Sequence, residues 1–464
     1  MTLTATNPHT GEKLRDYPAL SAEETQAAVA RAHETFASYR RTTFAERAGW
    51  MNRAAELLEE RAESLAQLAT NEMGKTLGAS RQEVLKCAKV CRYYAEHAAG
   101  FLAPQPAETG AERAEVRYLP LGVILAVMPW NFPFWQVFRF AAPTLMAGNT
   151  ALLKHASNVP GCALAIEEIF RDAGLPQGAF QTLMIGSRDV EAVLRDERVK
   201  AVSLTGSEGA GRAVSSTAGD VLKPALMELG GSDPFIVMPS ADLEEAVRSA
   251  VTSRTINNGQ SCIAAKRFIV HRSVYAPFRD RFVAAMRELR LGDPMDPQTD
   301  LGPLATSQIR SELHAQVQDA LDKGAELLLG GEVPQGSGFH YPATVLGNPS
   351  PDMNVWFEET FGPVATLYVV DDIEQAISLA NATRFGLSSS AWTQDSAEQE
   401  RFIEGLEAGA TFLNAMSVSD PRLPFGGVKA SGFGRELGRE GILEFVNTKA
   451  VSVGGSPHAG AKTE

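Results

Sequence analysis

"TALLKHASNVPGCALAIEEIFRDAGLPQGAFQTLMIG" covers residues 150–186 and decides the fold of this chain. The stretch begins with a short apolar strand at residues 150–156 and continues with a helical segment at residues 162–172. It ends in a second apolar strand at residues 181–186. Apolar strands that alternate with helices indicate a parallel sheet with helices on both of its faces.

The same alternation extends in both directions along the chain. Further strands of this first series are predicted at residues 122–127, 200–206 and 223–231, with a helix at 189–196. A second series has predicted strands at residues 233–238, 266–271, 365–370 and 409–414, with helices at 243–257, 274–289 and 373–382. We therefore predict an α/β protein with two interleaved α/β domains.

The two ends of the chain have a different character. The first hundred residues predict helices, with capping boxes at residues 21–24 ("SAEE") and 43–46 ("TFAE"). Helical apolar spacing runs over residues 44–70, and an amphipathic helix is expected at 80–97. The final "FVNTKAVSVGG" (445–455) is an isolated strand that needs a partner sheet, which another subunit could supply.

Composition excludes several classes of protein. The 464 residues contain 43 Lys and Arg against 56 Asp and Glu, a net charge of −13, which argues against binding to nucleic acids or anionic membranes. The four cysteines form neither a disulfide framework nor a zinc ligand set, so we expect no metal and a cytoplasmic location. We find no signal peptide pattern and no transmembrane segment.

Cys262 lies in "INNGQSCIAAKR" (256–267). One interpretation is a buried cysteine that acts as a small hydrophobe. However, Gly259, Gln260 and Ser261 precede it, so backbone amides and polar groups can approach its sulfur. A thiolate stabilised by such donors is a nucleophile, which is the interpretation we favour.

Three other polar residues occupy unusual positions. Glu228 ends an apolar strand in "MELGG" and is either a charge facing solvent or a general base. Asn131, in "MPWNFPFWQVFR", is either a turn residue or an amide donor to an oxyanion. Lys154 lies at a strand end, where α/β sheets bind ligands, or else extends its amine to solvent.

Glycine-rich segments suggest ligand contacts. In "LTGSEGAG", Gly206, Ser207 and Gly211 lie between a strand and a helix, a place suited to a phosphate, although such turns are common. "FEETFGPVA" contains Glu359 and Phe361 and could be an acidic surface loop. "LPFGGVKASGFGRE" is expected to be a loop that wraps around another part of the site.

Together, "MPWNFP", "MELGG", "GQSC", "EETFGPV" and "PFGGVKASGFGRE", in this order, resemble the aldehyde dehydrogenase superfamily over almost the whole chain. The 34 residues from Glu228 to Cys262 (262 − 228) match the family's interval between base and nucleophile. The resemblance implies that Cys262 attacks an aldehyde and that Asn131 and the Cys262 backbone N–H hold the oxyanion. Hydride then passes to a nicotinamide cofactor, and Glu228 activates the water that hydrolyses the thioester.

The resemblance also implies a cofactor site and a domain plan. The implied cofactor contacts are Trp130, Lys154, Ser157, Gly206, Ser207, Gly211, Leu229, Glu359 and Phe361. The implied domains are a Rossmann-like cofactor domain over residues 1–230, with part of an oligomerisation arm near 102–120, and a catalytic domain over 231–425. Residues 426–464 return to the cofactor domain and end in an oligomerisation strand. A homodimer or a homotetramer is expected.

Two positions bear on specificity. Relatives that prefer NAD commonly have a glutamate three residues after the strand-end lysine, where this chain has Ser157, so we expect NADP to be preferred, with NAD also usable. Arg139 matches an arginine that binds the substrate carboxylate in succinate semialdehyde dehydrogenases, and an arginine in an aromatic tunnel needs an anion. Trp135, Ser261 and Ser419 are further candidate substrate contacts.

The sequence departs from some relatives at two positions. Ile256 replaces a second arginine six residues before the nucleophile, and the nearest arginine is Arg254, which puts a two-arginine clamp in doubt. Ala264 replaces a redox-switch cysteine two residues after it. Alternative functions are oxidation of glutarate semialdehyde or of a neutral aliphatic aldehyde, and cofactor-free thiol esterase activity.

Overall fold

The computed structural model describes residues 2–454. Its first sheet has six strands in the order β17-β9-β8-β5-β6-β7. The strands are β5 (Val123–Met128), β6 (Thr150–His155), β7 (Phe180–Thr182), β8 (Val199–Thr205), β9 (Ala225–Glu228) and β17 (Gly432–Phe433). All are parallel except β17, which pairs antiparallel with β9. Since β5 pairs with both β6 and β8, the strand order reverses beside β5, and the carboxyl ends there form a crevice suited to a ligand.

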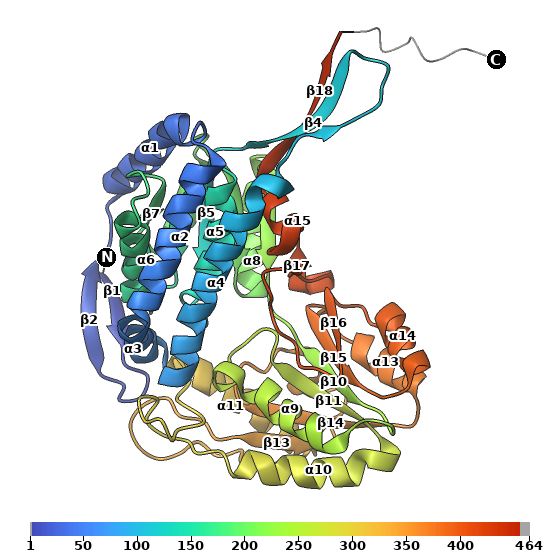
Figure 1. Cartoon of the computed structure of the whole chain (residues 1–464). Coiled ribbons are helices and arrows are strands. Elements are labelled where there is room, and N and C mark those ends of the chain that lie inside the picture. Colours follow the sequence, from blue (N-terminus) through green and yellow to red (C-terminus); the bar gives the residue numbers. More distant parts are fainter. Residues whose placement is uncertain (1, 455–464) are drawn as a thin grey trace, which may run out of the picture.

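Helices surround this sheet (Figure 1). They are α1 (Ala22–Tyr39), α2 (Phe44–Glu60), α3 (Ala62–Met73), α4 (Leu77–Phe101), α5 (Trp135–Met146), α6 (Pro160–Asp172), α7 (Val190–Arg195), α8 (Glu208–Asp220) and α15 (Gly438–Leu443). Both predicted capping boxes are present, at the starts of α1 and α2. The helical pattern over 44–70 is two helices, because Arg61 leaves helical geometry (φ −103°, ψ 12°) and ion-pairs with Asp172 of α6 at 2.7 Å.

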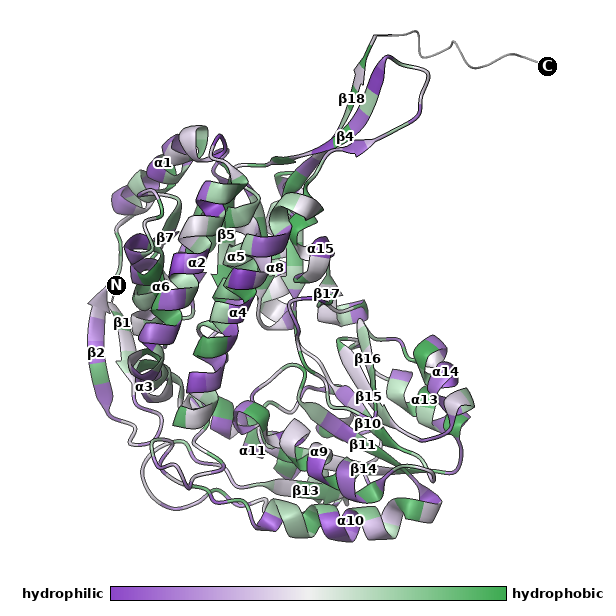
Figure 2. Ribbon diagram, in the orientation of Figure 1, coloured by the Kyte–Doolittle hydropathy of each residue, from purple (hydrophilic) through white to green (hydrophobic). Residues whose placement is uncertain are grey.

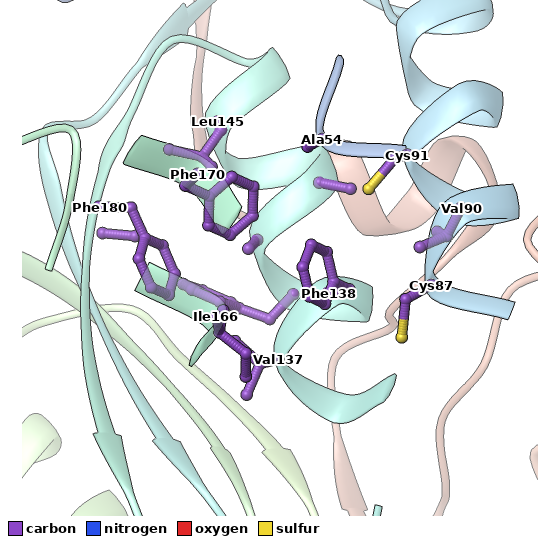
Figure 3. Close-up of a cluster of buried hydrophobic side chains, with 14 of the residues drawn as sticks. Ala54, Cys87, Val90, Cys91, Val137, Phe138, Leu145, Ile166, Phe170 and Phe180 are labelled. Atoms are coloured by element: carbon purple, nitrogen blue, oxygen red, sulfur yellow. The ribbon is translucent and has the colours of Figure 1, made fainter. Parts of the chain in front are cut away.

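The helix α5 was missing from the sequence-based prediction. Every one of its residues is buried, so it has no polar face and no amphipathic periodicity to detect. Figure 3 shows Val137, Phe138 and Leu145 of this helix among buried side chains of neighbouring elements. The ring of Phe138 lies 5.0 Å from that of Phe170, which lies 4.7 Å from that of Phe180. This packing fixes α5, and with it the segment that carries Asn131.

The second sheet has seven strands in the order β12-β13-β14-β11-β10-β15-β16. They are β10 (Asp233–Val237), β11 (Ala265–His271), β12 (Glu326–Leu329), β13 (Thr344–Gly347), β14 (Val364–Val370), β15 (Ser388–Trp392) and β16 (Ala410–Leu413). Its helices are α9 (Leu243–Thr255), α10 (Arg272–Arg287), α11 (Ser307–Asp322), α12 (Asn354–Phe357), α13 (Ile373–Asn381) and α14 (Ser396–Gly405). Only β12 pairs antiparallel, so the predicted α/β class with parallel sheets is confirmed.

Two smaller sheets complete the fold. A hairpin joins β1 (Thr2–Thr6) and β2 (Lys13–Pro18), and a three-stranded sheet has the order β18-β4-β3. Its strands are β3 (Gln105–Pro106), β4 (Arg113–Pro120) and β18 (Val446–Val453), and it projects from the body (Figure 1). The last strand was expected to need a partner sheet, and this chain itself supplies one, because β18 pairs with β4 over eight residues. The end of the predicted segment, residue 455, lies outside the described residues.

Surface helices such as α2 and α10 alternate hydrophilic and hydrophobic residues, as expected of helices with one buried face (Figure 2). Among residues 2–454, no helix is both long enough and apolar enough to cross a bilayer.

Candidate active site

A cavity of about 280 Å³ lies at the carboxyl ends of β5, β8 and β9, where the second domain faces the first sheet. Eight of the residues singled out in the sequence line it: Trp130, Asn131, Gly206, Ser207, Leu229, Cys262, Glu359 and Phe361. The ring of Trp130 meets that of Phe361 edge to face at 5.7 Å, across the two domains. Segments far apart in sequence therefore converge on one site at the reversal of strand order.

The segment before Cys262 has an unusual backbone. Asn257, Asn258 and Gly259 follow one another in the left-handed region, with φ of 57°, 58° and 76°. Asparagine tolerates this region better than most residues. A Cβ on Gly259 would lie 2.3 Å from the carbonyl carbon of Gly362, so only glycine fits there. This turn explains the "NNG" before the thiol and holds Cys262 at the cavity wall.

Asn131 is fixed by hydrogen bonds on both sides of its amide. Its Nδ2 donates to the carbonyl of Gln260 at 3.1 Å, and its Oδ1 accepts from Gln136 Nε2 at 3.1 Å. Asn257 Nδ2 in turn donates to the carbonyl oxygens of Asn131 (2.7 Å) and Gln260 (2.9 Å). An amide nitrogen has two hydrogens, so one donor of Asn131 remains available to a ligand in the cavity.

Lys266 ties the nucleophile segment to Glu359. Its Nζ donates to the carbonyls of Ser261 (2.8 Å) and Cys262 (2.6 Å) and forms an ion pair with Glu359 Oε1 at 3.1 Å. A Cβ on Gly230 would lie 2.5 Å from Glu359 Oε2, so the carboxylate faces the bare backbone after β9. The buried amine thereby fixes a carboxylate at the cavity and the thiol-bearing segment together.

The thiol of Cys262 is held in its neutral form. The pKa of Cys262 is raised to about 12, because the effect of burial exceeds the lowering effect of the positive charges of Lys266 and Arg139. The backbone N–H of Cys262 donates to no acceptor in residues 2–454, so it is free to bind a ligand oxygen. A base must therefore take the thiol proton before the sulfur can attack.

Glu228 is a carboxyl group without a hydrogen-bond partner. Both of its oxygens are buried and unbonded among residues 2–454, and a Cβ on Gly426 would lie 2.8 Å from Oε1. Burial raises its pKa well above the ordinary value; Glu436 raises it further, and Arg139 opposes the shift. A carboxyl whose pKa is raised by burial holds a proton more tightly than an exposed one, which is a property required of a general base.

Arg139 has an anion of its own. It forms a buried ion pair with Glu436, donates to Thr205 Oγ1 at 3.3 Å, and lies 4.5 Å from the ring centre of Phe425. The anion that the sequence predicts for this arginine is therefore present within the chain, as Glu436, and does not have to come from a substrate. The glutamate was not recognised because it is almost 300 residues away in sequence (436 − 139 = 297).

The other predicted substrate contacts are dispersed. Ser261 is fully buried, and its Oγ has no partner in residues 2–454. Ser419 lines a second, smaller cavity of about 40 Å³, together with Ile263, the residue after the nucleophile. Ser419 Oγ and the ring of Trp135 both contact Lys86, a residue that the sequence-based prediction did not include.

The remaining predicted cofactor contacts lie beside the cavity. Lys154 is almost buried at the end of β6, and its Nζ has no hydrogen-bond or ion-pair partner in the described chain, residues 2–454. Burial lowers the pKa of Lys154. Ser157 is exposed three residues later. Gly211 does not line the cavity but lies against Leu229, where a Cβ would come within 2.5 Å of its Cδ2.

Several residues of the site were not predicted. Besides Lys266, Gln136 and Asn257, they include Arg254, whose role the sequence left open. Arg254 is fully buried and donates to the carbonyls of Gly259 (2.7 Å) and Val364 (3.2 Å), so it supports the left-handed turn. These side chains donate hydrogen bonds to backbone carbonyls that lie near them only in the folded chain. No local sequence pattern therefore predicts their role.

Comparison with known proteins agrees with this geometry. The aldehyde dehydrogenase family model matches residues 1–451. The chain is 57% identical to "Succinate-semialdehyde dehydrogenase [NADP(+)] 1" of Mycobacterium ulcerans (strain Agy99), over 98% of this chain and 100% of that protein. It is also 57% identical to the protein of the same name from Mycobacterium tuberculosis (strain ATCC 25618 / H37Rv), over 97% and 99% of the two chains.

Solved structures give the same result. The succinic semialdehyde dehydrogenase of Streptococcus pyogenes, solved with NADP+, is 35% identical with a TM-score of 0.96, over 98% of this chain and 100% of that one. The succinate-semialdehyde dehydrogenase of Burkholderia pseudomallei is 35% identical with a TM-score of 0.95, over 98% and 95%. The chain belongs to the aldehyde dehydrogenase family.

Proposed function

We propose that this protein oxidises succinate semialdehyde to succinate with NADP, and that NAD is a weaker cofactor. The observation that carries the proposal is that Cys262 and Asn131 line one cavity and that Glu228 lies near enough to affect the pKa of Cys262, in a chain 57% identical to NADP-dependent succinate-semialdehyde dehydrogenases. The test is a comparison of kcat/KM for succinate semialdehyde, glutarate semialdehyde and butanal with each cofactor. The proposal requires succinate semialdehyde and NADP to give the highest value.

The first chemical step is attack by Cys262 on the aldehyde carbon, which gives a thiohemiacetal. The developing oxyanion lies within reach of two donors, the second hydrogen of the Asn131 amide and the free backbone N–H of Cys262. Because burial holds the thiol neutral, its proton must leave before the attack, and Glu228 can help to accept that proton only in its carboxylate form.

Glu228 then activates water. When its carboxylate form is generated, it can take a proton from a water molecule that attacks the thioester carbonyl, which releases succinate and the Cys262 thiolate. Gly426 lies against its Oε1 and leaves no room for a side chain there, so the 424–435 loop shapes the space around the base.

The described residues fit a nicotinamide dinucleotide. Lys154, with no partner of its own in residues 2–454, would bind the adenosine ribose and, with the hydroxyl of Ser157, a 2′-phosphate. Ser207 begins helix α8 and would lie near the pyrophosphate, while Glu359 would hold the nicotinamide ribose. The bound nicotinamide would accept the hydride that leaves the thiohemiacetal.

Three further assignments belong to this proposal. The cofactor domain comprises residues 1–230 and the catalytic domain 231–425, and residues 426–464 return to the first; the end of that last part, 455–464, lies outside the described residues. The projecting β18-β4-β3 sheet, which has β18 at an edge, supports a homo-oligomer, because an unpaired strand edge favours pairing. The four cysteines of the chain form no disulfide, which supports a reducing, cytoplasmic compartment.

A thiol esterase is the alternative from another class, since Cys262 and Glu228 could hydrolyse an activated ester without a cofactor. NADPH formed in proportion to the aldehyde consumed supports the dehydrogenase. Ester hydrolysis without NADPH formation from any aldehyde would support the esterase.

A further inference from the structure

The second cavity adjoins the reacting groups. Cys262 lines the first cavity, and the next residue, Ile263, lines the second. Gly426, also in the wall of the second cavity, lies against the carboxyl of Glu228. A short aldehyde bound at Cys262 would therefore have a second cavity next to it, lined by Ser419 and Phe425.

Lys86 of helix α4 does not line this cavity itself but contacts Ser419, which does. Its Nζ donates to Ser419 Oγ at 2.6 Å and lies 4.1 Å from the ring centre of Trp135. The amine thus lies between a hydroxyl in the cavity wall and an aromatic ring at the start of α5. An ammonium group in such a place keeps further hydrogens to donate to a ligand.

Lys86 has no carboxylate partner among the described residues, in contrast to three other cations around the site. Arg139 pairs with Glu436, Lys266 with Glu359, and Lys75 with Glu83. No carboxylate oxygen of residues 2–454 lies within ion-pair distance of Lys86. Its positive charge is therefore not paired within the described chain and lies one hydrogen bond behind Ser419 in the cavity wall.

The charges facing Lys86 come from three segments. The pKa of Lys86 is lowered to about 8, chiefly by burial and also by the positive charge of Arg139 of α5. Cys87 and Glu83 of α4, and Asp420 beside Ser419, act in the opposite direction. Asp420 is itself paired with Arg422 at 2.7 Å. Burial and Arg139 therefore disfavour the charged form of Lys86, and a bound carboxylate would stabilise it.

We propose that Lys86, together with Ser419 and Trp135, binds the carboxylate of the semialdehyde and is a specificity-determining residue of the reaction. This inference rests on the proposed function, since it assigns a role toward that substrate class. It replaces Arg139, whose charge Glu436 already neutralises, as the principal contact to the substrate carboxylate.

The test compares K86M, K86R and a control, K89M, which removes an exposed lysine from the same helix. For each protein, kcat/KM is measured for succinate semialdehyde and for butanal, which has the same carbon chain without the carboxylate. We expect K86M to lose about 30-fold or more with succinate semialdehyde and less than about 3-fold with butanal. K86R should recover most of the loss, and K89M should match the wild type.

A pH profile separates charge recognition from packing. In the wild type, KM for succinate semialdehyde should rise as pH passes about 8, because Lys86 loses its proton, while KM for butanal should not show this rise. In K86R the rise should move to higher pH, since arginine stays protonated. A residue that only packs would give neither result.

The outcomes distinguish the two proposals. If the wild type does not prefer succinate semialdehyde to butanal, both the proposed substrate and the role of Lys86 are overturned. If the wild type shows the preference and K86M retains it, or loses both substrates equally, only the role of Lys86 is overturned. If K86M does not fold, the pH profiles of the wild type and K86R test the role of Lys86. The inference is contradicted if KM for succinate semialdehyde and KM for butanal change with pH in the same way.

Discussion

Arg139 forms a buried ion pair with Glu436, and its guanidinium carbon lies 4.5 Å from the ring centre of Phe425. Phe425 and Glu436 also exchange backbone hydrogen bonds of 2.6 and 2.7 Å. The pair therefore fixes both ends of the 425–436 segment, which includes Gly426 beside the carboxyl of Glu228. Arg139 acts on the site through this loop.

R139A should destabilise the fold and reduce the activity toward every aldehyde alike. Removing one partner of a buried ion pair leaves the other charge uncompensated, which typically costs about 3–5 kcal/mol. Thermal unfolding should show a lower Tm, and the double variant R139M/E436Q should recover part of it. Selective loss of succinate semialdehyde oxidation with an unchanged Tm would contradict this role and would indicate that Arg139 binds the substrate carboxylate.

C262A should abolish aldehyde oxidation while NADP binding stays within about 3-fold of the wild type. The covalent intermediate needs the sulfur, whereas the other cavity residues are unchanged. Steady-state NADPH formation and fluorescence titration of NADP measure the two properties. Near-normal turnover in C262A would eliminate the proposed mechanism.

E228Q should block hydrolysis of the thioester more than hydride transfer. Loss of a general base typically costs about 10²–10⁴-fold in the step that it serves. Stopped-flow mixing with NADP and substrate should therefore show a burst of NADPH followed by little turnover. If both phases match the wild type, the base is another residue, and Glu359, which also lines the cavity, would be tested next.

The same variant should be more stable than the wild type at neutral and alkaline pH. Burial raises the pKa of Glu228 above its ordinary value of 4.5, so the folded state holds this proton more tightly than the unfolded state. The stability contributed by the neutral carboxyl is present below about pH 4.5 and is lost as pH rises through the folded-state pKa. The Tm difference between E228Q and the wild type should therefore grow from near zero at about pH 4.5 toward about pH 8.

E63Q, which neutralises an exposed glutamate of α3, is the matched control and should show no comparable dependence on pH. An E228Q protein that is less stable than the wild type at about pH 8 would mean that the carboxylate is the favoured form in the resting fold.

S157E should shift the cofactor preference from NADP toward NAD. The substitution removes a hydroxyl from the exposed position near Lys154 and adds a negative charge where the 2′-phosphate would lie. The lost contact and the added repulsion amount to roughly 2–4 kcal/mol, or about 30- to 1000-fold in the ratio of KM values. KM for both cofactors measures the shift, and an unchanged ratio would place the selectivity in other residues.

The sequence predicted the elements whose residues carry a periodic signal. The strands β5, β6 and β8 are short apolar runs, and the capping boxes mark where α1 and α2 begin. Helix α5 was missed because it is buried on every side. Strand β15 has the sequence "SSSAW", and its serines are acceptable in a core only because the fold supplies partners, such as the carbonyl of Ala415 for Ser390.

The site could be predicted where its residues belong to a family motif. Cys262, Asn131 and Glu359 were identified in this way and line one cavity. The sequence did not identify Glu436, the partner of Arg139, or Lys86, the partner of Ser419. Both pairs join residues about 300 positions apart, and Lys86 and Ser419 are separated by 333 residues. A pairing at that separation leaves no pattern in a single sequence, so only the folded chain reveals that Arg139 is neutralised and Lys86 is not.

The central claim is that Cys262 forms a succinyl thioester that Glu228 hydrolyses. Its most direct test is mass spectrometry of E228Q after brief mixing with NADP and succinate semialdehyde, followed by acid quench and digestion. The account predicts one succinyl group on the peptide that contains Cys262, and none in the C262A/E228Q double variant. NADPH formation with an unmodified Cys262, or a succinyl group on another residue, would contradict it.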